Sequence, residues 1–133
     1  MIFARRVFLI AAIYGFIVLW PQYFLEETIG RDTPPPITHP EYFYGFVGIA
    51  LAWQVVFLLI SRDPIRYRPL MLAAVIEKAS FGLPAIALYV SGRLSGQMLA
   101  AGLLDLILGA LFIASYRRTP VERVNTQLSS RFI

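Results

Sequence analysis

The amino-acid sequence predicts an all-α integral membrane protein, a four-transmembrane-helix antiparallel bundle that forms a single domain. Of its 133 residues, 58% are hydrophobic and 15% are charged, and its mean hydropathy is +0.66. A soluble domain of this size could not bury so much apolar surface in one core. Four apolar stretches have the length of about 20 residues that crosses a hydrocarbon core of about 30 Å. Arginines also flank these stretches asymmetrically, as they do in membrane proteins.

The predicted spans cover residues 7–25, 43–60, 70–90 and 98–116. Pro21 should loosen the last turn of the first span, and Pro84, which follows Gly82, should bend the third. The basic start followed by an apolar run also suits a signal peptide. No small-x-small cleavage site precedes Glu26, so we interpret this segment as a span.

The distribution of basic residues predicts the orientation. Arginines collect before the first span, between the second and third, and after the fourth, whereas the opposite side carries two arginines among several acidic residues. By the positive-inside rule, both termini are expected to be cytoplasmic, which fits a bacterial inner membrane. Aromatic residues at 20–24 and 42–44 fit the opposite membrane interface. Topology therefore accounts for the net charge of +4, and no nucleic-acid partner is expected.

The connections between spans carry their own signals. In the outer loop, residues 26–41, Gly30 and the run Pro34-Pro35-Pro36 predict an extended, non-helical segment. Asp63 before Pro64 predicts a helix N-cap with proline in the first turn. The short connection at 91–96 predicts that the third and fourth spans are antiparallel neighbours.

The predicted cytoplasmic tail, residues 117–133, contains a capping box at Thr119-Pro120-Val121-Glu122. Val121, Val124 and Leu128 then recur at helical spacing. This pattern predicts a short C-terminal amphipathic helix on the membrane surface. Because the pattern is short, a frayed polar tail is the alternative.

Three ionisable residues lie inside the apolar stretches: Glu77, Lys78 and Asp105. A charge at membrane depth costs at least about 2.5 kcal/mol even on the lenient insertion scale. At about 1.5 Å of rise per residue, these groups lie about 13 to 18 Å from the nearest flanking arginine, and Tyr14 and Gln54 lie about 12 Å away. All four spans thus carry a polar group near one depth. We predict that they form one ligand-binding layer of Tyr14, Gln54, Glu77, Lys78 and Asp105.

Within this layer, Asp105 lies on a column of small residues with Ala101 and Gly109, a surface that lets helices approach closely in lipid. We expect Lys78 to pair with Asp105, because neighbouring residues on one helix project about 100° apart. Glu77 would then lack a full counter-charge, which favours its protonated form. It is therefore the candidate catalytic acid if the protein is an enzyme.

Structural roles are the alternatives for the same residues. A buried Lys78–Asp105 pair can serve only to fix helix register. Glu77 can be a protonated carboxyl group hydrogen-bonded to Tyr14 or Gln54. Gln54 can simply hold neighbouring helices together.

Several other chemistries are not supported by the sequence. The absence of cysteine excludes disulfides and thiol redox chemistry. His39 is the single histidine, and with scattered carboxylates it matches no metal-ligand spacing, so no metal site is predicted. Phosphate-loop and serine-hydrolase motifs are also missing from the sequence. The sequence does not identify a cofactor.

The basic N-terminus, the four spans and the loop between the first two resemble the small DoxX-like membrane proteins. The fourth span carries this resemblance at residues 105–112, Asp-Leu-Ile-Leu-Gly-Ala-Leu-Phe, and at Tyr116-Arg117-Arg118. Through residues 53–57 and 68–71, the chain is also similar to the four-helix group of the emopamil-binding protein and the sigma-2 receptor. That similarity implies a lipid-like ligand facing acidic residues. The chain lacks the intramembrane histidine and paired glutamates of those isomerases, so isomerase activity is not implied.

Taken together, the residues predict a pocket for a hydrophobic small molecule such as a quinone, an isoprenoid or a sterol-like lipid. Membrane lipid and this ligand are the expected partners. The main alternative is a non-catalytic accessory subunit of a larger membrane complex, and homo-oligomers are compatible with either function. The third reading is a component of a proton-coupled transporter, which needs a continuous polar path.

Overall fold

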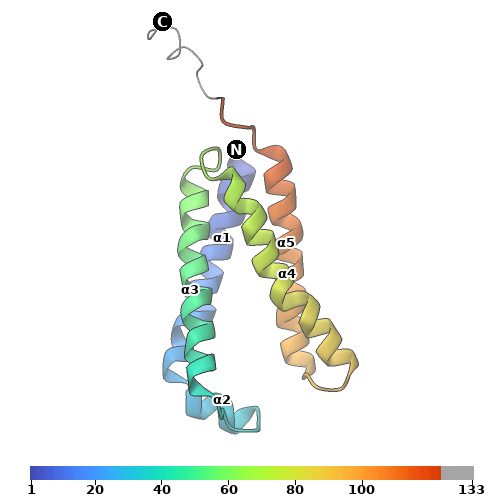
Figure 1. Ribbon diagram of the computed structural model, residues 1–133. Helices are drawn as coiled ribbons and strands as arrows, with labels where there is room; N and C mark the ends of the chain where they lie inside the picture. The colour runs from blue at the N-terminus through green and yellow to red at the C-terminus, as the bar shows by residue number, and fades with distance from the viewer. Residues whose placement is uncertain (124–133) are drawn as a thin grey trace, which may run out of the picture.

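The computed structural model describes residues 1–123, and every regular element in that part of the chain is helical (Figure 1). Four segments, Ile2–Phe24, Pro40–Arg62, Arg68–Val90 and Gly96–Arg118, are long and apolar enough to cross a membrane. The predictions of an all-α class and of four helices long and apolar enough to span a membrane are confirmed, and the chain is an integral membrane protein by this criterion. The elements in order are α1 (Ile2–Leu19), the 3-10 helix η1 (Trp20–Phe24), α2 (Glu26–Asp32), α3 (Pro40–Arg62), α4 (Arg68–Val90) and α5 (Gly96–Arg118).

The helices extend beyond most of the predicted apolar limits. The first segment begins at Ile2 instead of residue 7, and α5 ends at Arg118 instead of residue 116. Hydropathy marks only the apolar part of a span, whereas backbone hydrogen bonding continues into flanking polar residues. At Pro21 the α-helix gives way to η1, as expected for a residue without a backbone N–H. Helix α4, by contrast, continues through Pro84.

The prediction of a wholly non-helical outer loop at 26–41 is wrong for its first half, which forms α2. Glu26 and Glu27 occupy its first turn and Arg31 its last, an arrangement that favours a helix through its macrodipole. The Thr33 hydroxyl donates to the carbonyl oxygen of Ile29 at 2.6 Å and closes the last turn. The proline run begins only after this turn, and residues 33–39 are non-helical.

The connection between α3 and α4 is a short turn at residues 64–67, and Asp63 caps it. Asp63 Oδ1 accepts a hydrogen bond from the Arg66 backbone N–H at 3.2 Å, but this bond caps a single turn and α4 begins at Arg68. A helix started at residue 64 would place Pro69 in its interior, where proline breaks the hydrogen-bond ladder.

A further correction concerns the tail. The Thr119 hydroxyl donates backward to the carbonyl oxygen of Ser115 at 2.7 Å, and residues 120–123 are non-helical. Because this hydroxyl completes α5, it does not cap a new helix at this point. The rest of the predicted amphipathic helix, including Val124 and Leu128, lies outside the described residues.

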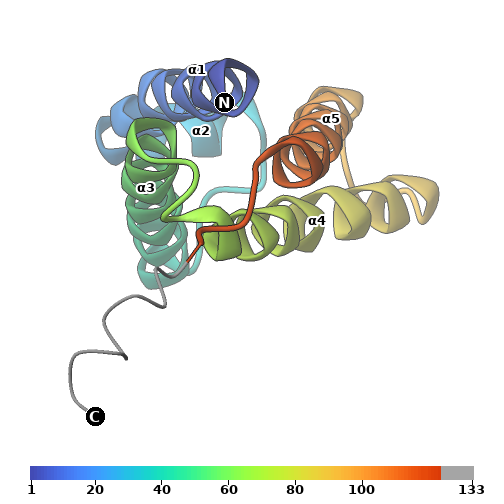
Figure 2. The same cartoon turned by 90° about the horizontal axis from the view of Figure 1, so that it is seen from above.

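The long helices associate as two pairs. Helix α1 packs along α3, and α4 packs along α5; the view from above places the first pair beside the second (Figure 2). The tight turn before α5 uses Gly92 at φ +73°, a conformation that favours glycine. The expected antiparallel contact between the third and fourth spans is confirmed.

The two pairs share a core at one end only. Phe8 of α1 stacks on Phe112 of α5 with ring centroids 4.2 Å apart, and Phe57 of α3 contacts Phe112 at 5.1 Å. Met71 and Ala74 of α4 complete this core. The other core cluster, of Leu19, Val47, Ala50 and Leu51, comes from α1 and α3 alone. Accordingly, the pairs diverge away from the end that carries the N-terminus (Figure 1).

Candidate functional site

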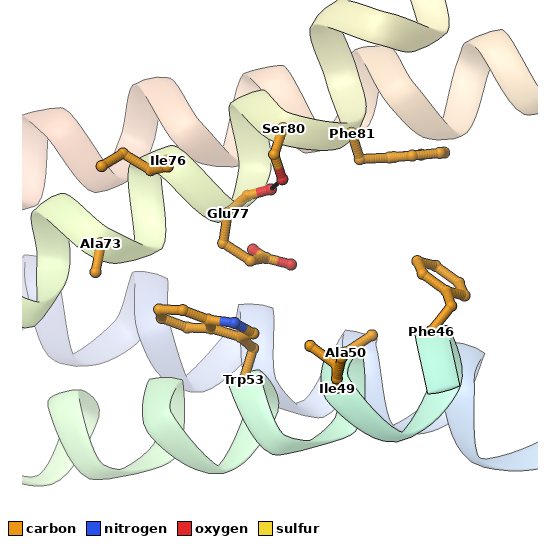
Figure 3. A pocket seen from close by; sticks show the side chains of 9 residues that line it. All are labelled: Phe46, Ile49, Ala50, Trp53, Ala73, Ile76, Glu77, Ser80 and Phe81. Atoms are coloured by element: carbon orange, nitrogen blue, oxygen red, sulfur yellow. Dashed lines mark hydrogen bonds between the residues drawn. The ribbon is translucent and has the colours of Figure 1, made fainter. Parts of the chain in front are cut away.

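A groove of about 370 Å³ lies between α3 and α4, where the helix pairs diverge. Helix α3 presents its wall at a spacing of three, four and seven residues, and α4 presents its wall at the same spacing. This spacing places each set on one helix face. The lining residues are Phe46, Ile49, Ala50, Trp53, Ala73, Ile76, Glu77, Ser80 and Phe81 (Figure 3).

The groove carries one ionisable group on otherwise mostly apolar walls. Its walls are apolar and aromatic, and Glu77 is the only ionisable residue among those that line it. The Glu77 carboxylate points into the space between the helices, with Trp53 on the facing wall (Figure 3). The Ser80 hydroxyl is turned back onto α4, where it donates to the Glu77 carbonyl oxygen at 2.7 Å. A small molecule in this groove would therefore meet one carboxyl group on an otherwise apolar surface.

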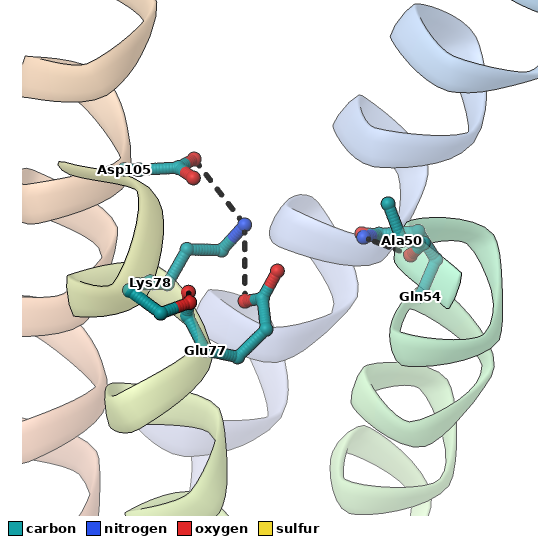
Figure 4. A network of polar contacts seen from close by, with 6 residues as sticks. Ala50, Gln54, Glu77, Lys78 and Asp105 are labelled. Carbon is teal, nitrogen blue, oxygen red and sulfur yellow. Dashed lines mark hydrogen bonds and ion pairs between the residues drawn. The ribbon is translucent and has the colours of Figure 1, made fainter. Parts of the chain in front are cut away.

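Lys78 links both intramembrane carboxylates. Its Nζ lies 3.2 Å from Asp105 Oδ1 and 3.4 Å from Glu77 Oε2 (Figure 4). The lysine side chain is 8% exposed and each carboxylate side chain is 18% exposed. The cluster is therefore largely buried inside the protein. The expected Lys78–Asp105 pair is confirmed. Lys78 also reaches Glu77, at the longer distance, because the flexible lysine chain bends its Nζ between the two acids.

The contact to Glu77 is an ion pair without hydrogen-bond geometry. Among the described residues, Glu77 Oε2 is one of two buried side-chain oxygens that accept no hydrogen bond. Lys78 donates its hydrogen bond to Asp105 instead, and it lies 5.4 Å from the centre of the Phe57 ring. Within residues 1–123, the Glu77 carboxyl group therefore makes no side-chain hydrogen bond, whereas Asp105 Oδ1 accepts one from the lysine.

Small residues bring α4 and α5 close enough for this pairing. A Cβ at Gly102 would lie 2.6 Å from the Ala85 Cβ, and one at Gly109 would lie 3.4 Å from the Lys78 Cβ. The expected close approach at Gly109 is confirmed, while Ala101 is only half-buried. Gly102 was not predicted; it lies seven residues before Gly109, a spacing that the sequence shows.

Gln54 is buried but lies apart from the charged cluster. It is 2% exposed, and its Nε2 donates to the Ala50 carbonyl oxygen at 2.9 Å on its own helix. Its Oε1 is the second buried oxygen that accepts no hydrogen bond within residues 1–123. The amide packs so closely against Gly15 of α1 that a Cβ there would overlap it. Figure 4 shows Gln54 on α3, across the space from Glu77.

Tyr14 takes no part in the cluster. Its side chain is 37% exposed, and its hydroxyl makes no hydrogen bond in the described part of the chain. The next residue, Gly15, is the one that faces Gln54. Of the five predicted site residues, the structure therefore brings together Glu77, Lys78 and Asp105. It buries Gln54 at the α1–α3 contact, and it leaves Tyr14 outside.

The aromatic walls were not predicted as part of the site. Phe46, Trp53 and Phe81 line the groove, and their helical register with Ala50 and Glu77 was the available signal. Hydrophobic periodicity cannot distinguish a groove wall from a lipid-facing surface, because both are apolar in a membrane helix. No group of three or more histidine and acidic side chains in residues 1–123 could hold a metal ion.

Comparison with family models, curated proteins and solved structures finds no match to this chain. The class of protein is therefore defined by the fold and the groove themselves. The protein is an all-helical integral membrane protein with four candidate spans, a lysine-bridged acid pair and a lateral groove that reaches one of the acids.

Proposed function

We propose that this protein binds a hydrophobic small molecule with a polar head group in the groove between α3 and α4. A quinone, an isoprenoid or a sterol-like lipid has the required chemistry. The observation that carries the proposal is the position of Glu77, the one ionisable side chain in an apolar and aromatic groove. Ligand sites commonly combine apolar walls with a few polar groups that fix orientation.

The charge balance of the cluster supports a role for Glu77 as a hydrogen-bonding group. One lysine faces two carboxyl groups, so the cluster is neutral when one proton is shared among the acids. A neutral cluster avoids the high free energy of an uncompensated charge at membrane depth. Asp105 already accepts the lysine hydrogen bond. In our proposal the proton resides on Glu77, which donates it as a hydrogen bond to a ligand carbonyl or hydroxyl oxygen.

We also propose that the helices form an antiparallel bundle in a bacterial inner membrane with both termini in the cytoplasm. Arginines in the first turns of α1, between α3 and α4, and at the end of α5 support this orientation. The chain contains no cysteine, so single cysteines introduced at Arg66 and at Ser91 can report it. In intact cells, an impermeant thiol reagent should label only the variant at Ser91. Labelling of the Arg66 variant alone would show that the orientation is opposite to the one proposed.

The binding proposal is tested with photoreactive quinone, isoprenoid and sterol probes in vesicles that contain the purified protein. We expect one probe class to crosslink to α3 and α4, within residues 46–53 and 73–81. Glu77→Met removes the hydrogen-bond donor and keeps an unbranched side chain of similar length. It should reduce labelling by about fivefold, because a neutral hydrogen bond contributes about 1 kcal/mol. Mass spectrometry of the crosslinked peptides provides the measurement.

Glu27→Met is the matched control, because it makes the same chemical change at an exposed acid on α2. This variant should be crosslinked by the probe as strongly as the unmodified protein is. Equal labelling of the Glu77 and Glu27 variants would contradict the proposal. If Glu77→Met instead dissociates a co-purifying membrane complex while the monomer stays folded, the accessory-subunit function replaces ligand binding. A pH-dependent ion flux in the same vesicles would support transport.

A further inference from the structure

A second cavity lies between α1 and α3, at the end of the molecule that carries the N-terminus. It has a volume of about 390 Å³ and is lined by Arg5, Arg6, Leu9, Leu58, Ser61 and Arg62. Two arginines come from the start of α1 and one from the last turn of α3. The two leucines lie about one helical turn further into the spans. The cavity thus combines a cationic rim with an apolar floor.

The three arginines of this cavity differ from others at the same end of the molecule. Arg68 donates to the Thr119 carbonyl oxygen at 2.8 Å and lies 3.7 Å from the centre of the Tyr116 ring. Arg118 lies 4.5 Å from the Phe3 ring centre. These side chains serve the fold.

The guanidinium groups of Arg5, Arg6 and Arg62, by contrast, make no hydrogen bond, ion pair or ring contact within residues 1–123. The basic partners in the ion pairs within residues 1–123 are Arg31, His39 and Lys78. Residues 124–133 add no aspartate or glutamate side chain. Three like charges thus line one cavity, and no acidic side chain within residues 1–123 pairs with them, an arrangement that an anion would relieve.

We propose that this cavity binds the phosphate of an anionic phospholipid, with the acyl chains running along Leu9 and Leu58. Guanidinium groups bind phosphate oxygens through paired N–H donors, and three arginines from two helices line this cavity. The cavity lies where apolar spans begin and end, which is the level of the lipid head groups. Basic pockets between transmembrane helices suit anionic lipid head groups for these reasons.

A soluble phosphate could satisfy the same guanidinium groups, but the apolar floor favours the lipid. Leu9 is 42% exposed, and Leu58 is half-buried beside it. A free phosphate would leave these leucine side chains uncovered, whereas a phospholipid would place its first methylene groups on them. The site is separate from the groove that contains Glu77, and it does not depend on what that groove binds.

The test is native mass spectrometry of the full chain in detergent, with phosphatidylglycerol or phosphatidylcholine added. We expect phosphatidylglycerol to be retained preferentially. Arg62→Gln should weaken its retention by about fivefold, the usual contribution of one basic residue near a membrane surface. Replacing the three cavity arginines by lysine keeps the charges that membrane insertion requires. It should still weaken retention, because lysine lacks the forked geometry.

Arg117→Gln is the matched control, since it removes an exposed arginine at the end of α5 that does not line the cavity. Its retention of phosphatidylglycerol should equal that of the unmodified protein. If Arg117→Gln weakens retention as much as Arg62→Gln does, the lipid is held by diffuse surface charge and the proposal is wrong. Displacement of the lipid by millimolar inorganic phosphate alone would instead assign the cavity to a soluble anion.

Discussion

Lys78 organises the polar interior of this protein. It is the only lysine in the chain. The basic residues that flank the apolar stretches are arginines. A compact ammonium group on a flexible stem can lie between two carboxylates, while a planar guanidinium prefers a two-pronged contact with one. This difference explains how Lys78 can contact Glu77, its neighbour in sequence, and Asp105 on another helix at the same time.

We expect Lys78→Met to destabilise the protein by about 3 kcal/mol, because removing one partner leaves buried carboxyl groups without a counter-charge. Unfolding in detergent, followed by circular dichroism, measures the change. The triple variant Lys78→Met/Glu77→Gln/Asp105→Asn removes every charge of the cluster and should recover much of the loss. If the single variant is as stable as the unmodified protein, Lys78 does not compensate the acids.

At the scale of elements, small residues decide how closely the helices approach. Gly15 admits the Gln54 amide between α1 and α3, and Gly102 admits Ala85 between α5 and α4. Helix association in lipid depends on such close packing, since the hydrophobic effect does not favour protein over lipid contact. The charged cluster is therefore held by backbone proximity as well as by its own ion pairs.

Gly15→Ala should destabilise the α1–α3 contact by about 1 to 3 kcal/mol, the usual effect of overpacking. Thermal unfolding in detergent is the measurement. The added methyl group would overlap Gln54, so the second change Gln54→Ala should restore much of the stability. Gly45→Ala is the control, because a Cβ at Gly45 meets no atom within 4 Å. Equal unfolding temperatures for the Gly15 and Gly45 variants would refute the overlap.

For the whole molecule, the key feature is that the two helix pairs share a core at one end only. The Phe8, Phe57 and Phe112 rings join them there, and the second core cluster belongs to α1 and α3 alone. The groove between α3 and α4 follows from this arrangement. A shared core along the full length would have filled it with side chains.

Phe112→Ala should cost about 3 kcal/mol, as expected for an aromatic side chain that is 0% exposed. It should also widen the separation of the helix pairs, because Phe112 contacts rings from both α1 and α3. Spin labels at Gly45 on α3 and Leu88 on α4 would report this change as a longer and broader distance distribution. Phe24→Ala, at a ring that is 77% exposed, should leave both measurements unchanged.

The sequence by itself determined the class of the molecule and the positions of its spans. Long apolar stretches have one stable backbone solution in lipid, the helix, because only intrahelical bonds satisfy the peptide groups there. Their rare charges were also visible. These features depend on composition and spacing within single segments, which the chain shows directly.

Only the tertiary structure decided which polar groups meet and where a ligand can enter. Tyr14 and Gln54 share the depth of the charged residues, yet one faces outward and the other packs on Gly15. Helical rise fixes depth, but the rotation of each helix depends on packing with its neighbours. The same packing leaves the groove beside Glu77 and the arginine cavity between α1 and α3. Both sites combine residues from two helices, so neither can be read from one segment.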